Sequence, residues 1–105
     1  MKVFKIKINQ FIDDHQPGWV ECSFFDALGK EHIARDKVPI FTVEHLDSNS
    51  KYPKEGLVGC EIMKTWKNKK KQTVYTVSSS IWGVETIEGL TEFDLFAAQL
   101  TDLAR

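Results

Sequence analysis

The chain has 105 residues, of which 42% are hydrophobic and 28% are charged, and these are the proportions of an ordinary globular domain. This length suits one domain over residues 1–105 and is too short for two full cores, while the apolar content excludes intrinsic disorder. The net charge of −1 excludes a global field that recruits nucleic acid or membrane.

The start of the chain gives no sign of export. Residues 1–10 alternate charged and apolar side chains and contain no apolar segment of the signal-peptide type. No stretch of the sequence is long and apolar enough to cross a bilayer. We therefore expect a cytoplasmic protein without membrane contact, in which Cys22 and Cys60 are free thiols that pack as small apolar residues.

The first third of the chain predicts three strands. Residues 4–8 and 20–24 alternate apolar and polar side chains, which is the pattern of half-buried strands. The polar residues 13–18 between them predict a turn. Residues 26–29, Asp-Ala-Leu-Gly, predict a hairpin connection, because aspartate can bond to its own backbone and glycine accepts positive φ. A shorter strand is expected around residues 31–35.

The middle of the chain is harder to assign. Pro39 interrupts any hydrogen-bonded ladder or helix interior within residues 37–46. One helical turn at residues 42–46 is compatible with the sequence. Residues 47–56 predict a loop, because serine, asparagine, proline and glycine dominate them.

The second half predicts a hairpin followed by an ambiguous end. Residues 57–66 alternate, and residues 72–79 are rich in threonine, valine and tyrosine, so both predict strands joined by a turn at Asn68. Residues 91–103 fit either a strand or a helix. We favour a strand from Thr91 that runs into a short helical end.

Together these segments predict the fold class. Six or more short strands with mostly tight turns indicate a mainly β protein, a small antiparallel barrel or strongly curved sheet of six to eight strands with at most a short helix. A closed barrel suits this length best, because closure removes exposed strand edges.

The sequence contains no complete catalytic or metal-binding signature. Its histidines and cysteines lack the spacing of a zinc site. Asp13, Asp14 and His15 in a loop offer groups that bind a metal or relay a proton, but no activated nucleophile, phosphate loop or second acid pair accompanies them. We therefore expect no enzymatic activity, no cofactor and no metal, and interpret this loop mainly as a turn.

The charge distribution instead favours binding to a protein. Residues 51–71 contain seven lysines against two glutamates, whereas residues 84–105 contain five acidic residues against one arginine. Such polarity favours steered association with an oppositely charged partner. Trp19 directly follows a Pro-Gly turn, and such a tryptophan can either cap the core or anchor a partner. The predicted contacts are Asp13, Asp14, Trp19, Glu85, Glu88, Glu92 and Asp94.

Single-stranded nucleic acid is the alternative partner. Lysines that neutralise phosphates beside aromatic side chains that stack on bases are typical of a single-strand-binding barrel. The residues concerned lie at the tip of the second predicted hairpin and are Lys64, Trp66, Lys67, Lys69, Lys70 and Lys71. The near absence of arginine, which both pairs and stacks, weakens this interpretation.

Several segments together resemble a group of short, uncharacterised bacterial β-rich proteins, and more distantly the immunity proteins of contact-dependent and other polymorphic toxin systems. The segments are residues 13–22 (Asp-Asp-His-Gln-Pro-Gly-Trp-Val-Glu-Cys), 36–39 (Asp-Lys-Val-Pro), 52–53 (Tyr-Pro), 59–61 (Gly-Cys-Glu) and 83–85 (Gly-Val-Glu). The resemblance implies a small barrel-like protein without a cofactor. Toxin neutralisation by covering the active site of a basic nuclease is the specific function we expect, and no functional residue carries over by position.

Overall fold

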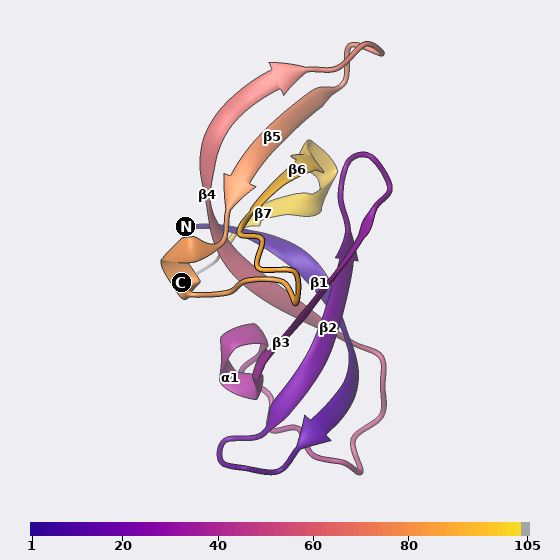
Figure 1. Ribbon diagram of the computed structural model, residues 1–105, viewed down its shortest axis with the longest axis vertical. Helices are drawn as coiled ribbons and strands as arrows, with labels where there is room; N and C mark the ends of the chain where they lie inside the picture. The colour runs from indigo at the N-terminus through magenta and orange to yellow at the C-terminus, as the bar shows by residue number, and fades with distance from the viewer. Residues whose placement is uncertain (104–105) are drawn as a thin grey trace.

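Seven antiparallel strands build one strongly curled sheet in the computed structural model, which describes residues 1–103 (Figure 1). The strands are β1 (Lys2–Asp13), β2 (Trp19–Phe25), β3 (Glu31–Lys37), β4 (Lys54–Lys67), β5 (Thr73–Ser78), β6 (Glu92–Phe96) and β7 (Leu100–Asp102). The helical segments are α1 (Val38–Phe41) and the two 3-10 turns η1 (Ser80–Trp82) and η2 (Ala97–Gln99). The predicted fold class, a mainly β protein with a strongly curved antiparallel sheet, is confirmed. The closed barrel that the length favoured is not formed, because β3 and β6, the two ends of the strand order, do not pair within residues 1–103.

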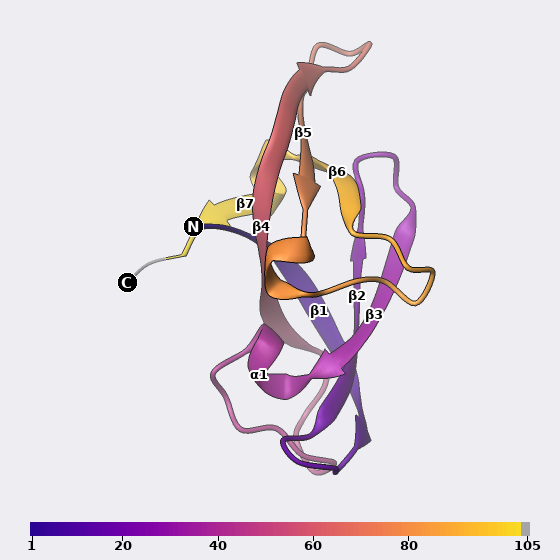
Figure 2. The same ribbon diagram turned by 60° about the vertical axis from the view of Figure 1, so that its left-hand side comes forward.

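Two long strands organise the sheet, whose order is β3-β2-β1-β4-β5-β6. The first half of β4 pairs with β1, and its second half pairs with β5, so β4 belongs to both halves of the curled sheet. The short strand β7 pairs with the start of β1, on the edge that β2 occupies further along that strand. Figure 2 shows how this pairing brings the end of the chain beside its beginning.

The core lies inside the curl, where the predicted apolar faces meet. Phe4 and Ile8 of β1 are almost completely buried, as is Cys22 of β2. The rings of Phe4 and Phe24 are 4.9 Å apart at their centroids, and Phe24 lies 5.0 Å from Phe93 of β6. These edge-to-face contacts join β1, β2 and β6 across the interior, so the aromatic side chains stabilise the curvature as well as the core.

The turn between β2 and β3 follows its sequence prediction. The Asp26 carboxylate oxygen Oδ1 accepts hydrogen bonds from the backbone N–H groups of Leu28 (2.9 Å) and Lys30 (3.0 Å). Gly29 has a φ of 83°, in the left-handed region that favours glycine. The sequence between the two strands therefore specifies this hairpin locally.

The helix of the middle segment lies earlier than expected. Residues 42–46 do not form a helical turn; instead α1 spans Val38–Phe41 and ends at Thr42. Pro39 is in the first turn of this helix, where a backbone N–H has no acceptor within the helix, so the ring is tolerated. Within residues 1–103 no helix combines the length and the apolar character needed to cross a bilayer.

The end of the chain is mostly extended. The preferred prediction of a strand with a short helical end is confirmed for β6 and η2, and the helical alternative for residues 91–103 is wrong. The sequence did not predict that β7 would follow. Its backbone pairs with Lys2, Val3 and Phe4, a contact between chain ends that no local pattern encodes.

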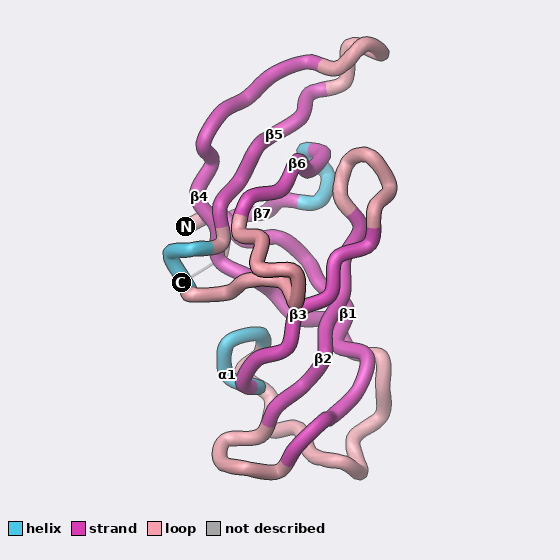
Figure 3. The backbone as a smooth tube through the Cα atoms, in the orientation of Figure 1, coloured by secondary structure: helices cyan, strands magenta, loops and turns pink. Residues whose placement is uncertain are grey.

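The tip of the β4–β5 hairpin, beyond the residues of β5 that pair with β6, extends from the rest of the molecule. It forms one end of the longest dimension, which is 44 Å, while the turn between β1 and β2 lies at the other end (Figures 1 and 3). The tip contains Asn68, whose side-chain oxygen accepts hydrogen bonds from the N–H groups of Lys70 and Gln72. The predicted turn at Asn68 is therefore confirmed.

Candidate binding surfaces

The β2–β3 turn and β6 lie beside each other and bring acidic side chains together. The backbone N–H of Ala27 donates a 2.7 Å hydrogen bond to the carbonyl oxygen of Asp94. Residues 84–90 lie along β3, where the N–H of Ile87 bonds to the carbonyl oxygen of Ile33 at 2.9 Å. These two backbone contacts attach separate parts of the chain to one hairpin.

We call the resulting region the acidic surface and define it as Asp26, Glu88, Glu92 and Asp94. Glu88 is 3.6 Å from the Lys30 ammonium group of the β2–β3 turn, and both side chains are about half exposed. Such an exposed pair contributes little to stability, so it leaves Glu88 accessible to a partner.

An open pocket of about 390 Å³ lies within the acidic surface. It contains three carboxylates, from Asp26, Glu92 and Asp94, and one ammonium group, from Lys64. The excess of negative charge suits a positively charged side chain of a partner, because partial enclosure strengthens the attraction between unlike charges. The complete lining is Asp26, His32, Lys64, Thr76, Glu92, Phe93 and Asp94.

His32 supports this pocket from the core side. His32 is only 4% exposed, its ring packs against both Phe24 and Phe93, and its Nε2 is 2.8 Å from the Asp26 carboxylate. Its other ring nitrogen, Nδ1, is buried without a hydrogen-bond partner among residues 1–103. The imidazole therefore fixes the orientation of Asp26 while its faces pack in the core.

Asp26 is held as an anion. Burial favours its neutral form, but the hydrogen bonds from His32 and from the N–H groups of Lys30 and Leu28 outweigh burial and lower the pKa of this carboxyl. Sequence analysis interpreted Asp26 only as a turn residue. The signal that could have located the pair is its spacing, because a tight hairpin places residue 32 opposite residue 24 and therefore diagonal to residue 26 on the same face.

The predicted partner contacts form two separate groups. Glu88, Glu92 and Asp94 belong to the acidic surface, and Glu85 is exposed in the same loop as Glu88. The remaining three lie apart from this surface, at the end of the long axis opposite the β4–β5 tip, where β1 ends and β2 begins (Figure 1). These are Asp13, Asp14 and Trp19.

At that opposite end, Trp19 is half-buried and the Lys37 ammonium nitrogen lies 5.8 Å from the centroid of its ring. Trp19 is also the neighbour of Asp13 across the β1–β2 ladder. The tryptophan therefore has polar partners within the chain, and whether it caps the core or anchors a partner stays a prediction.

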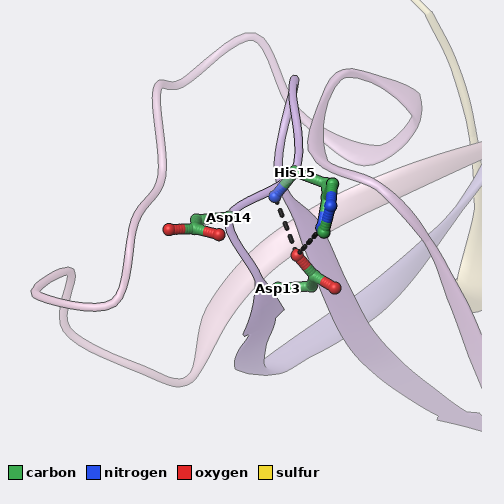
Figure 4. Close-up of side chains that lie close together, drawn as sticks. All are labelled: Asp13, Asp14 and His15. Atoms are coloured by element: carbon green, nitrogen blue, oxygen red, sulfur yellow. Dashed lines mark hydrogen bonds and ion pairs between the residues drawn. The ribbon is translucent and has the colours of Figure 1, made fainter.

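The Asp13, Asp14 and His15 side chains form the one group with metal-ligand geometry among residues 1–103, with donor atoms within 4.8 Å of one another. All three are exposed, and Figure 4 shows Asp13 and His15 facing each other while Asp14 makes neither drawn contact. The N–H and ring of His15 bond to Asp13 and lower the pKa of that carboxyl, and the carboxylate in turn raises the pKa of His15. Asp13 and His15 therefore interact with each other as polar side chains of a solvent-exposed turn do.

The predicted nucleic-acid-binding residues stay together on the β4–β5 ribbon. Lys64 and Trp66 lie within β4, Lys67 ends that strand, and the other three lysines follow at the tip. All six side chains are exposed. We call this group, Lys64, Trp66, Lys67, Lys69, Lys70 and Lys71, the basic ribbon.

A larger open groove of about 850 Å³ lies on the outer face of β1, β2 and β3, and the sequence did not predict it. Three lysines in its lining are matched by three glutamates, so its charge favours neither anions nor cations. The charged residues concerned are Lys5, Lys7, Lys54, Glu21, Glu31 and Glu55.

Comparison with protein-family models, with curated proteins and with solved structures found no match to this chain. The relation to immunity proteins therefore stays a prediction, and function is argued from the surfaces alone.

Proposed function

We propose that this chain is a binding protein for a basic protein partner, and that neutralisation of a toxin is its specific role. The observation that supports this most directly is the acidic pocket. Its carboxylates come from the β2–β3 turn and from β6, and the backbone hydrogen bond from Ala27 to Asp94 joins these two elements.

The pocket offers a place for one cationic side chain. An arginine or lysine that enters it meets Asp94 and Glu92 on one side and Asp26 on the other. Because His32 and two backbone N–H groups already orient Asp26, this carboxylate needs little rearrangement on binding. Preorganised charges lose less entropy on association, which raises affinity.

Neutralisation would follow from occlusion. A nuclease toxin holds phosphate groups and therefore presents a basic active site. An acidic surface carried on paired strands covers such a site without chemistry of its own, and the surrounding negative charge accelerates encounter. The residues of the acidic surface would bind the partner, and none of them would act in catalysis.

The test compares two charge-reversal variants of equal net charge. Glu88→Lys with Glu92→Lys changes the acidic surface, and Asp14→Lys with Glu55→Lys changes exposed acids elsewhere. The probe is a purified basic nuclease domain, and association rates are measured by surface plasmon resonance at low and high salt.

The acidic-surface variant should associate about 10-fold more slowly or worse, with a weaker salt dependence, because the steering field is lost. The control variant should retain the rate of the unchanged protein. Equal rates for both variants and the unchanged chain would remove the acidic surface from the proposal.

A further inference from the structure

The basic ribbon carries a second inference, about a different class of partner. We propose that it is a binding site for single-stranded nucleic acid, with the lysines contacting phosphates and Trp66 stacking on a base.

The lysines of the ribbon are free to meet an anion. Within residues 1–103 none of the five forms an ion pair, whereas Lys2, Lys30 and Lys54 each pair with a carboxylate. The tip of the ribbon, which carries Lys67, Lys69, Lys70 and Lys71, also extends beyond the pairing of β5 with β6, so a strand of phosphates can approach it there (Figure 3). These four unpaired cations are a footprint for a polyanion, whereas Lys64 lies closer to the carboxylates of the acidic surface.

Trp66 adds an oriented aromatic ring, which a site that binds a polyanion through charge alone does not require. Its side chain is 37% exposed, yet the indole Nε1–H donates a 3.1 Å hydrogen bond to the hydroxyl oxygen of Thr76 on β5. The Thr76 hydroxyl in turn donates to the Asp94 carboxylate at 2.6 Å. This chain of bonds holds the ring in one orientation, which prepares it for stacking.

The pairing of β4 with β5 places the positive charge of Lys64 beside the Trp66 ring. Lys64 is the neighbour of Thr76 in the β4–β5 register, and Trp66 is two residues further along β4, so both side chains project from the same face. Tyr75 occupies the alternate face and packs against the core. Trp66 is therefore the stacking residue, and Tyr75 is excluded from the role.

Stacking selects single strands among the polyanions. A ring fixed on a ribbon surface can cover only a base that has left its own stack, as the bases of single strands do. An acidic polypeptide would use the lysines but gain little from an oriented indole. The ribbon therefore fits single-stranded nucleic acid better than an acidic protein.

The first experiment tests the charges with the full chain and a labelled single-stranded oligonucleotide, by fluorescence anisotropy over a series of salt concentrations. Replacing Lys67, Lys69 and Lys70 with glutamine should reduce the slope of log K against log salt by about 2, because each phosphate contact on a single strand contributes roughly 0.7. The matched control replaces Lys5, Lys7 and Lys51, which are exposed and unpaired elsewhere, and should retain the slope.

The second experiment tests the stacking role with polyglutamate as the comparison polymer. Trp66→Leu should weaken oligonucleotide binding roughly 5- to 150-fold and leave polyglutamate binding unchanged. Thr76→Val removes the acceptor for the indole and should weaken oligonucleotide binding in the same direction, whereas Thr76→Ser keeps a hydroxyl and should restore it. Circular dichroism of each variant reports whether the fold is intact.

Three results would contradict the proposed nucleic-acid site. No oligonucleotide binding at low salt, equal slopes for the two lysine variants, or equal losses for oligonucleotide and polyglutamate on changing Trp66 would each overturn the site. Because no protein partner is present in these measurements, their failure is separate from failure of the proposed function.

Discussion

The two cysteines, Cys22 and Cys60, have low reactivity because their side chains are buried. Burial, with a smaller effect of Glu21 and Asp36, raises the pKa of the Cys22 thiol to about 12, and burial raises that of Cys60 to about 11. Both residues are buried and neither is in a disulfide. The thiolate is the reactive form, so these thiols contribute to packing alone.

A thiol reagent provides the corresponding prediction. At pH 8 the folded protein should react on a scale of hours or slower with a chromogenic disulfide reagent, since roughly one Cys22 in ten thousand is ionised at a pKa four units higher. In denaturant both thiols should react at once. Rapid labelling of the folded protein, with its circular dichroism unchanged, would contradict the burial of these residues.

The Asp26 carboxyl gives a second prediction at the residue scale, on pH dependence. Its pKa is lowered from the ordinary value of 3.8 in the folded state, so its contribution to stability is complete above that value. The contribution is lost as pH falls below 3.8 through the folded pKa. Asp26→Asn should cost about 1–2 kcal/mol at pH 7, since hydrogen bonds to a charged group are lost.

Urea unfolding between pH 7 and pH 2 measures this effect. The unfolding free energies of Asp26→Asn and of the unchanged protein should converge as the pH falls. Asp14→Asn is the control, because this exposed carboxyl makes no hydrogen bond with Asp13 or His15, and its difference from the unchanged protein should stay near zero (Figure 4). A constant gap for Asp26→Asn at every pH would contradict the proposed anion.

At the scale of single elements, the hairpin tip contains local strain. Lys71 is the one residue other than glycine with positive φ among residues 1–103, at 63°. A left-handed conformation costs an L-residue roughly 1–2 kcal/mol, and glycine regains much of it despite its greater freedom when unfolded. Lys71→Gly should therefore stabilise the protein by about 0.5–1 kcal/mol in thermal or urea unfolding. Lys70→Gly, without that strain to relieve, should not.

The 3-10 turn η1 is attached to the sheet through a contact that requires glycine. A Cβ atom at Gly59 of β4 would lie 2.2 Å from the Trp82 ring, far inside contact distance. Gly59→Ala should therefore destabilise by about 1–3 kcal/mol or more, because the indole must move. Combining it with Trp82→Ala should cost less than the sum of the two single changes. Additive costs in urea unfolding would contradict this packing.

Sequence reasoning succeeded for elements whose signals are local. The alternation in residues 4–8, the turn at Asp26 and the turn at Asn68 depend on neighbouring residues, and the structure has each where it was predicted. It failed for α1, because Pro39 was interpreted as a breaker although the first turn of a helix accepts proline. It could not predict β7, whose partner strand is at the other end of the chain.

The candidate surfaces show the same difference. A local sequence pattern was enough to locate one of them, whereas contacts between distant parts of the chain form the other. Counting charges along the chain located the basic ribbon correctly, because one hairpin carries all of it. The acidic residues were predicted as one set of contacts, but whether Asp13 lies near Glu92 depends on the whole topology, and the β1–β2 turn lies at the end of the molecule away from β6 (Figure 1). Asp26 gains its role only from the contact between its turn and β6.

At the scale of the whole molecule, the strand order predicts how stability is distributed. β1 is hydrogen-bonded on both sides, to β4 on one edge and to β2 and β7 on the other, and its inward side chains form the core. The distal half of the ribbon has paired strands but exposed side chains. Local opening should therefore begin at the ribbon tip and reach β1 last.

Native-state hydrogen exchange followed by NMR tests this order. Amides of Phe4, Ile6 and Ile8 should exchange only through global unfolding, with opening free energies equal to the value from urea. Amides of residues 67–73 should exchange at much lower free energies, because they open without disturbing the core. A ribbon that frays independently can adjust to a bound strand while the acidic surface keeps its shape. Equal protection in both regions would show instead that the hairpin tip and the rest of the sheet open as one unit.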